Sequence, residues 1–539
     1  MNNTPINLKS LLLNANQALR EKRYSEGKVL LEKVFSLNPD IFEVCFNLGL
    51  INFQLGNLDA SIFYFEKANK INPESSQVYF NLGLAFDKKK ETNLAIKNFK
   101  KVTELDPKNS FAFYNLGSIY QEIFKREEAE KYLKKSINLN PNYELAYNNL
   151  FEVYDWSNQI DKYTELLKKL EKKNTEKNTF NFYCGILEYK KKNYNQAIKI
   201  LESVQLNKNN FLQDIKKHGV LAKSYDHIRK FDKAFEYFES NNNLVDYHFG
   251  KNINEKIYIK YINQRLNFFE NFKNNRWKNL YKINKIDDPI FLIGFPRSGT
   301  TLLDTILRTN KSVEVIEEKP ILRNFLNQIE NKTKNNFNLL EDLDNENIEK
   351  LRDVYFQERN KYLKNKNSQI VIDKLPLNII HVGEILRFFP NAKFILALRH
   401  PYDSVLSCFM QQFSLNPAMK NFLNIEKSAY LYDLVMRLWT IYLKAFSINF
   451  HIIKYEDIVS NFEKTTKDIY KYLNIDWTDK TKDFYLTAKN RMDISTPSYD
   501  QITSPIYSKS INRWKNYEKK FKSSKKYLDK WVKQFDYKI

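Results

Sequence analysis

Residues 289–307 read PIFLIGFPRSGTTLLDTIL and indicate the architecture of the C-terminal half of the chain. The first five residues are apolar, the loop GFPRSGTT follows, and a second apolar run begins at Leu302. This order is typical of a buried strand, a tight loop and the start of a helix. In such a loop the backbone N–H groups and the positive end of the helix face an anion, and Gly294 and Gly299 permit its close approach. The segment therefore predicts a phosphate-binding loop.

The loop differs from that of nucleoside triphosphatases, which reads G-x-x-x-x-G-K-[ST] and places the Lys on the outer phosphates and the hydroxyl on Mg²⁺. Thr300 stands at the Lys position, and the positive charge is Arg297, inside the loop. A triphosphate with its metal ion would be poorly bound by this arrangement. The 3 cysteines and 6 histidines also lack metal-ligand spacing, so no metal site is predicted.

A second stretch, FILALRHPYDSVLS at 394–407, has the same strand-then-helix character. It places Arg399 directly after the apolar run and Ser407 in the helix that follows. An Arg side chain offers a bidentate fork to a phosphate, and a Ser hydroxyl adds a further donor. The pair predicts a second phosphate contact.

The two stretches together resemble the donor site of the sulfotransferase family, whose donor is 3′-phosphoadenylyl sulfate (PAPS). GFPRSGTT resembles the family's 5′-phosphosulfate loop, and Arg399 with Ser407 resembles its clamp on the 3′-phosphate. His400 stands where the family usually has an acidic or amide residue, which leaves the local charge open.

Three further motifs resemble the branch that includes protein-tyrosine sulfotransferases and bacterial proteins that join tetratricopeptide repeats to a sulfotransferase domain. They are Asp373-Lys374-Leu375-Pro376, Lys454-Tyr455-Glu456-Asp457, and Tyr507 followed by Ser510-Ile-Asn-Arg513-Trp514. The resemblance covers residues 287–520 and implies a P-loop-like α/β domain with a parallel sheet.

Sulfuryl transfer needs an in-line acceptor oxygen, a base for its proton, and cations for the charge that grows on the sulfuryl and leaving phosphate oxygens. Glu318 falls where the tyrosine-sulfotransferase branch has its catalytic Glu, and a carboxylate whose pKa is raised by enclosure could accept the proton. Glu317 is the competing candidate. Arg297 and Lys374 are expected to stabilise the transferred group and the departing phosphate, so that no metal is required.

The resemblance also implies a set of donor-binding residues. They are Arg297, Ser298, Gly299, Thr300 and Thr301 around the 5′-phosphosulfate, Arg399 and Ser407 on the 3′-phosphate, and Tyr455 and Ser510 as further contacts.

The N-terminal half repeats itself. Prolines stand at 39, 73, 107 and 141, and Asn-Leu-Gly recurs at 47–49, 81–83 and 115–117, a period of 34 residues. With aromatic residues at matching positions, this pattern resembles the tetratricopeptide repeat, in which small residues let two helices approach and Pro ends the second one. The match fades beyond Pro141 and revives near Gly185, so about seven stacked hairpins are expected.

Stacked hairpins of this kind build a continuous core and a concave groove suited to an extended peptide. We therefore expect the repeats to bind a protein or peptide partner, with a scaffolding or dimerising role as the alternative. The predicted division is 1–245 for an all-α repeat solenoid, 246–286 for a helical or irregular linker, and 287–539 for the α/β sulfotransferase domain.

The net charge of +22 suits an anionic ligand or an acidic partner, although the lysines are spread over both halves, as a compositional bias would also produce. No nucleic-acid partner is expected. No apolar run approaches the length of a membrane span, and the N-terminus lacks the pattern of a signal peptide. A cytoplasmic protein is expected.

The expected function is transfer of a sulfuryl group from PAPS to a hydroxyl, on a protein or peptide of the tyrosine type, with adenosine 3′,5′-bisphosphate as the product. A small-molecule or glycan acceptor is the nearest alternative. A P-loop nucleotide kinase is disfavoured by Thr300, and a non-catalytic repeat scaffold is disfavoured by the retention of the charged residues named above.

Overall fold

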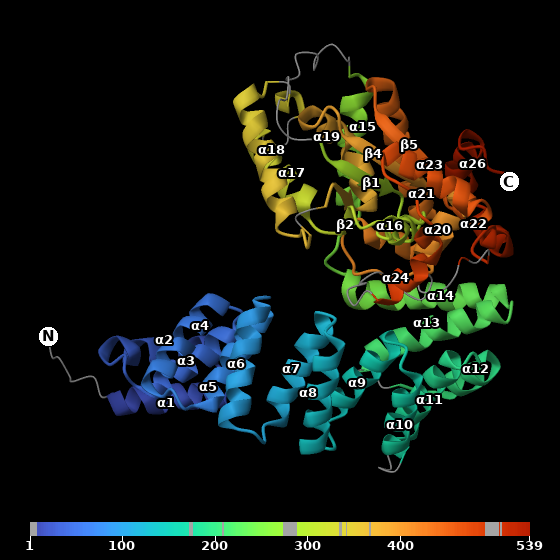
Figure 1. The fold of residues 1–539 in the computed structure, drawn as a ribbon. Coiled ribbons are helices and arrows are strands. Elements are labelled where there is room, and N and C mark those ends of the chain that lie inside the picture. Colours follow the sequence, from blue (N-terminus) through green and yellow to red (C-terminus); the bar gives the residue numbers. More distant parts are fainter. Residues whose placement is uncertain are drawn as a thin grey trace. The chain divides into compact units, whose positions relative to one another are not determined.

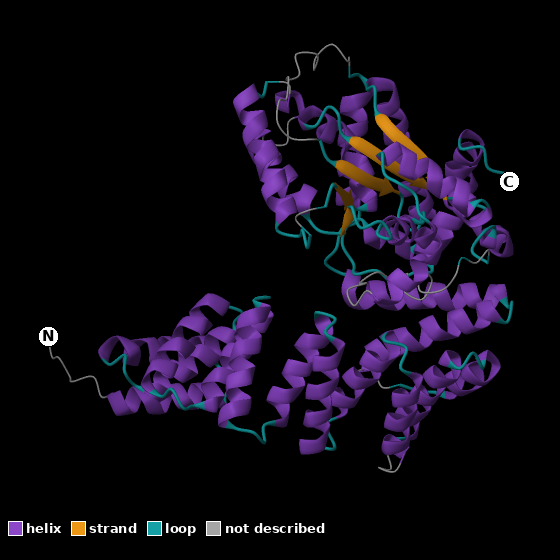
Figure 2. Ribbon diagram, in the orientation of Figure 1, coloured by secondary structure: helices purple, strands orange, loops and turns teal. Residues whose placement is uncertain are grey.

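A computed structural model describes residues 8–171, 176–206, 210–272, 288–333, 337–340, 342–365, 368–490, 506 and 509–538. The chain divides into two compact units, Met1–Thr175 and Glu176–Ile539. The described part of the first unit is helical, and the second unit combines helices with a five-stranded sheet (Figures 1 and 2).

The first unit consists of consecutive helix pairs. They are α1 (Leu8–Arg20) with α2 (Tyr24–Leu37), α3 (Phe42–Gln54) with α4 (Leu58–Ile71), α5 (Ser76–Lys88) with α6 (Thr92–Leu105), α7 (Ser110–Glu122) with α8 (Arg126–Leu139), and α9 (Glu144–Trp156) with α10 (Ile160–Glu171). In the pairs α3–α4, α5–α6 and α7–α8 a glycine of the first helix faces a large side chain of the second. A Cβ atom on Gly83 would lie 2.8 Å from the ring of Phe99, and one on Gly49 would lie 2.5 Å from Phe65. The predicted pairing of small and aromatic positions is therefore confirmed.

The turns between the paired helices keep the same period. Each contains a residue with positive φ, and these residues are Lys22, Gly56, Lys90, Phe124, Asn158 and Lys192. They are 34 residues apart, and Asn158 lies where the sequence signature fades. The hairpin geometry therefore continues through the weak repeat.

The second unit begins with two more helix pairs. These are α11 (Lys177–Lys190) with α12 (Tyr194–Ser203), and α13 (Phe211–His227) with α14 (Phe231–Val245). Gly185 of α11 repeats the close packing, since a Cβ atom there would lie 2.5 Å from Leu201 of α12. The predicted helical-repeat solenoid is confirmed.

The sheet of the second unit is entirely parallel, with strand order β2-β3-β1-β4-β5. The strands are β1 (Ile290–Gly294), β2 (Val313–Glu317), β3 (Ile370–Lys374), β4 (Lys393–Leu398) and β5 (Asn449–Lys454). β1 and β4 are almost completely buried, as expected for apolar strands covered by helices on both faces. The predicted α/β parallel-sheet domain is confirmed, and the residues that follow β1, β3 and β4 meet at one edge of the sheet.

Helices surround this sheet (Figure 2). The α-helices are α16 (Thr300–Leu307), α17 (Ile321–Thr333), α18 (Asn345–Asn360), α19 (Val382–Phe388), α20 (Pro401–Phe409), α21 (Ile425–Ala445), α22 (Tyr455–Ser460), α23 (Phe462–Leu473), α24 (Phe484–Asn490) and α26 (Lys525–Gln534). Short 3₁₀ segments complete the described elements: η4 (Phe337–Leu340), η5 (Pro376–His381), η6 (Met419–Leu423), η7 (Asp479–Asp483) and η8 (Arg513–Phe521).

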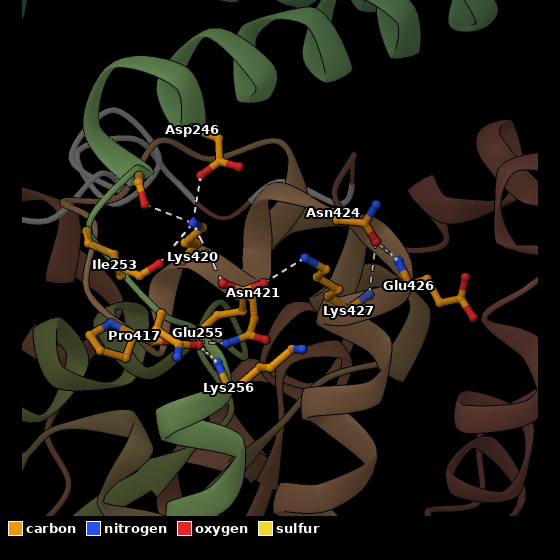
Figure 3. A network of polar contacts seen from close by, with 12 residues as sticks. Asp246, Ile253, Glu255, Lys256, Pro417, Lys420, Asn421, Asn424, Glu426 and Lys427 are labelled. Carbon is orange, nitrogen blue, oxygen red and sulfur yellow. Dashed lines mark hydrogen bonds and ion pairs between the residues drawn. The ribbon is translucent and has the colours of Figure 1, made fainter.

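The described part of the predicted linker contains a π-helix, η2 (Asp246–Gly250), and α15 (Lys256–Glu270). Lys420 of η6 binds this segment, since its Nζ donates to the carbonyl oxygens of Gly250 (2.8 Å) and Ile253 (2.9 Å) and pairs with Asp246 at 3.1 Å (Figure 3). The segment is thus attached to the α/β part. The predicted boundary near residue 286 lies outside the described residues.

Candidate active site

The loop after β1 is shaped by two glycines. A Cβ atom on Gly294 would lie 2.5 Å from the carbonyl oxygen of Ala397 in the neighbouring strand β4. Gly299 has a φ of 93° and directly precedes α16, whose first N–H groups have no acceptor within the helix. The side chains of Ser298, Thr300 and Thr301 are buried beside these N–H groups. The loop therefore has the form of an anion cradle at a helix start.

Arg297 joins this loop to the one after β4. Its backbone has a φ of 67°, and its Nε donates to Oγ of Ser407 in α20 at 3.0 Å. Arg399 donates from Nη1 to the carbonyl oxygen of Arg297 at 3.2 Å. Two stretches that the sequence separates by about a hundred residues are thus joined by hydrogen bonds into one cationic site.

Arg399 is buried and oriented from two further sides. Its Nη2 donates to the carbonyl oxygen of Ser510 at 2.6 Å, and its guanidinium carbon lies 5.0 Å from the ring centre of Tyr455. The structure therefore brings Tyr455 and Ser510 to the predicted 3′-phosphate clamp. Tyr507 of the same C-terminal motif lies outside the described residues.

A second cluster lies at the ends of β2 and β3, where Glu317 and Lys374 are register partners. Nζ of Lys374 contacts Oε1 of Glu317 at 2.9 Å and Oε1 of Glu318 at 3.1 Å. Burial alone would lower the pKa of Lys374, but the charges of Glu317, Glu318 and Asp304 outweigh it, and the pKa is raised. Lys374 therefore stays charged at neutral pH.

The two carboxylates differ in exposure. The side chain of Glu317 is 8% exposed and that of Glu318 is 42% exposed. The enclosure expected around Glu318 is therefore not found, because the chain turns outward at this residue with a φ of 50° while its N–H donates to the carbonyl oxygen of Lys374 at 2.8 Å.

His400 stands at a position whose local charge could not be predicted from the sequence. Burial lowers its pKa, so the ring is neutral at pH 7, and the ring stacks on Trp514 with 5.3 Å between ring centres. Its backbone N–H donates to Glu456 at 2.9 Å. The family's usual acidic or amide side chain is thus replaced by an aromatic contact, and the acidic partner here is Glu456. Glu456 belongs to the motif Lys454-Tyr455-Glu456-Asp457 named from the sequence, but the motif does not specify which backbone N–H its carboxylate accepts from.

Among the described residues, no helix has the length and apolar character needed to cross a bilayer. Within the same residues, no group of three or more His, Cys, Asp or Glu side chains is arranged to hold a metal ion.

These features define an α/β domain with a parallel sheet, a glycine-shaped loop at the start of α16 and a Lys–Glu cluster at the ends of β2 and β3. Residues 289–479 match the model of the sulfotransferase family, and residues 42–75, 76–109 and 112–143 match a tetratricopeptide repeat model. The chain therefore carries a sulfotransferase-family domain C-terminal to tetratricopeptide repeats.

One curated protein is similar to part of the chain. An uncharacterized protein of Aquifex aeolicus (strain VF5) is 28% identical over 313 residues, which is 56% of this chain and 39% of that protein. The chain thus spans well under half the length of this relative.

Solved structures match parts of the chain. A crystal structure of MamA is 21% identical with a TM-score of 0.30, covering 32% of this chain and 95% of that one. A tetratricopeptide repeat protein from Parabacteroides merdae ATCC 43184 is 13% identical with a TM-score of 0.36, covering 44% and 93%.

Proposed function

We propose that the protein is a PAPS-dependent sulfotransferase that modifies a hydroxyl on a protein or peptide, of the tyrosine type. The observation that carries the donor assignment is the joining of the two phosphate loops through Arg297, Ser407 and Arg399. Nε of Arg399 is buried and has no hydrogen-bond partner among the described residues. A buried guanidinium with an unsatisfied N–H fits a site whose remaining partner is a phosphate oxygen.

In the proposed reaction the acceptor oxygen bonds to sulfur while the bond between sulfur and the 5′-phosphate oxygen breaks, releasing adenosine 3′,5′-bisphosphate. Glu318 takes the acceptor proton at a carboxylate oxygen. Glu317 holds the ammonium group of Lys374 at the end of β3, and Lys374 offsets negative charge on the transferred group. Arg297 and the N–H groups at the start of α16 hold the 5′-phosphate.

Isothermal titration calorimetry tests the donor assignment. The full chain is expected to bind adenosine 3′,5′-bisphosphate without Mg²⁺, and Arg399→Ala is expected to lose that binding by about 10²-fold, since a charge-assisted phosphate contact is removed. Arg437→Ala, which changes an exposed Arg of α21, is the control. A preference for Mg-ATP over adenosine 3′,5′-bisphosphate would contradict the proposal and favour the kinase alternative.

The repeats support a peptide acceptor through a row of asparagines. Asn47, Asn81 and Asn115 hold the same position in α3, α5 and α7, and all three are half-buried. The carboxamides of Asn81 and Asn115 each donate to the carbonyl oxygen four residues earlier, at 2.8 Å, which orients them. Because a carboxamide offers the same donor and acceptor as a peptide group, such a row suits an extended chain.

Sulfation with labelled donor in a cell lysate tests the acceptor. In the full chain, combined Asn81→Ala and Asn115→Ala are expected to reduce the label in protein several-fold and leave the affinity for adenosine 3′,5′-bisphosphate unchanged. Asn57→Ala, at an exposed turn of the same unit, is the control. Label that enters small molecules or glycans, with no effect of the double variant, would contradict a protein acceptor.

A further inference from the structure

Helix α14 of the last repeat hairpin, α13–α14, contacts the C-terminal end of α20, the helix that carries Ser407. The ring of Phe235 in α14 stacks on Phe409, the last residue of α20, with 4.9 Å between ring centres and an interplanar angle of 21°. Nδ2 of Asn242 donates to the carbonyl oxygen of Phe409 at 3.0 Å and to that of Leu423 at 3.3 Å. The C-terminal end of α20 is therefore held by α14.

Asp226, near the end of α13, binds the C-terminal segment η8. Its Oδ2 accepts from Nη2 of Arg513 at 2.8 Å, and its Oδ1 accepts from the hydroxyl of Tyr517 at 2.5 Å. The Asp226 side chain is only 16% exposed, and the ring of Phe231 meets Tyr517 edge-on at 5.4 Å. Tyr517 departs from helical geometry, with φ −123° and ψ 16°, at the residue whose hydroxyl this carboxylate binds.

The start of η8 is bound in turn to the donor site. Asp403 of α20 is buried and accepts from the backbone N–H groups of Asn512 (2.7 Å) and Trp514 (2.8 Å), on either side of Arg513. Ser510, two residues before Asn512, supplies the carbonyl oxygen that accepts from Arg399 at 2.6 Å. Asp403 thus binds the backbone at the start of η8, and Asp226 binds the side chains of Arg513 and Tyr517. The Ser510 carbonyl oxygen that orients Arg399 lies just before the residues that Asp403 binds.

We infer that Asp226 is a positioning residue of the 3′-phosphate clamp and that the α13–α14 hairpin is a structural part of the nucleotide site. By binding Arg513 and Tyr517, Asp226 fixes η8, and η8 fixes the Ser510 carbonyl oxygen against Arg399. The inference rests on the proposed function, because it takes Arg399 and Ser407 to bind a 3′-phosphate. It assigns a role in donor selection to a repeat that would otherwise only bind a partner.

Calorimetry with two nucleotides tests this inference on the full chain. Adenosine 3′,5′-bisphosphate and adenosine 5′-phosphate differ only in the 3′-phosphate, so the ratio of their affinities reports the clamp. Asp226→Asn is expected to lower that ratio about tenfold, since two hydrogen bonds to a charged group are weakened. The matched control is Asp232→Asn: Asp232 pairs with Lys520 of the same segment at 3.2 Å but is 81% exposed, so the ratio should change less than about twofold.

Two further variants separate positioning from general loss of fold. Tyr517→Phe removes only the hydroxyl and is expected to lower the ratio in the same direction, by a smaller factor. The double variant Asp226→Asn with Arg513→Gln is expected to lower the ratio no further than the single variant with the larger effect. The two changes are not additive, because Asp226 and Arg513 bind each other.

The outcomes are distinct. An unchanged ratio in Asp226→Asn, or an equal loss of both nucleotides, would overturn the positioning role and leave the proposed function standing. A wild-type chain that does not prefer the 3′-phosphorylated nucleotide would overturn the proposed function and the inference with it. Circular dichroism melting of each variant checks that the second unit remains folded.

Discussion

At the scale of single residues, Lys374 contacts two carboxylates with one buried ammonium group. A base must reach the acceptor, and Glu318 is five times more exposed than Glu317, as their side-chain values of 42% and 8% show. Protonation of Glu318 also leaves the pair of Glu317 and Lys374 intact, so the buried charge stays balanced during transfer. On this difference we propose that Glu318 takes the proton and that Glu317 orients Lys374.

Replacing Glu318 with Gln is expected to lower turnover by about 10²-fold or more, since the proton acceptor is lost, without changing the affinity for adenosine 3′,5′-bisphosphate. Glu317→Gln is the comparison, and it should affect donor affinity and turnover together because it loosens Lys374. Steady-state kinetics with calorimetry of both variants distinguish these patterns. Unchanged turnover in Glu318→Gln would move the role of the base to Glu317.

Asp373, the neighbour of Lys374 on β3, makes stability depend on pH. Burial raises its pKa from 3.8 to about 7, although the Tyr355 hydroxyl donates to it at 3.2 Å. Between these values the folded chain holds a proton that the unfolded chain releases, so the free energy of unfolding falls as pH rises from about 4 to 7 and levels off above that.

Asp373→Asn keeps the side chain neutral at every pH and is expected to remove this fall. Its stability relative to the wild type should therefore be similar at pH 4 and higher at pH 8. Urea unfolding at the two pH values, followed by circular dichroism, measures the difference. A difference that is the same at both pH values would show that Asp373 does not titrate in the folded chain.

At the scale of elements, the sequence was informative wherever a motif is contiguous. The loop after β1 and the stretch through Arg399 are each one strand, one loop and one helix, so their chemistry could be recognised without the fold. Asp226 could not be found in this way, because an isolated Asp on a helix has no signature. Asp403 lies within the second stretch, but nothing in that stretch indicates that it binds the C-terminal segment. Asp226 acquires its role only when folding brings it to Arg513, 287 residues further along the chain.

The repeat hairpins depend on glycines that leave room for a facing side chain. Gly83→Ala is expected to destabilise the first unit by ~1–3 kcal/mol, because a Cβ atom 2.8 Å from the Phe99 ring forces the two helices of the pair apart. Gly27→Ala in α2 is the control: its Cβ atom would meet the end of the Leu19 side chain at 3.3 Å, and added helix propensity offsets the contact. Thermal unfolding of the full chain compares the two, and equal stabilities would contradict the packing argument.

At the scale of the whole molecule, the repeat pattern and the compact units divide the chain at different places. The pattern predicts one array over residues 1–245, whereas the chain separates into units at Thr175 and Glu176. A repeat period is a local property and does not specify what the terminal hairpin packs against. Phe235 of α14 packs on Phe409, and Asp226 of α13 binds η8. We therefore propose that the part of the chain needed for nucleotide binding begins at α11 and includes α11–α14.

Two truncations test where that boundary lies. Residues 176–539 keep α11–α14 and are expected to bind adenosine 3′,5′-bisphosphate with the affinity of the full chain. Residues 246–539 lack Asp226, Phe235 and Asn242, which uncovers the end of α20 and frees η8, so binding should fall by at least tenfold, as for the loss of several buried contacts to one helix. Calorimetry measures both, with circular dichroism to establish that each fragment is folded. Equal affinity in the two fragments would place α13–α14 outside the nucleotide site and restore the division that the repeat pattern alone predicts.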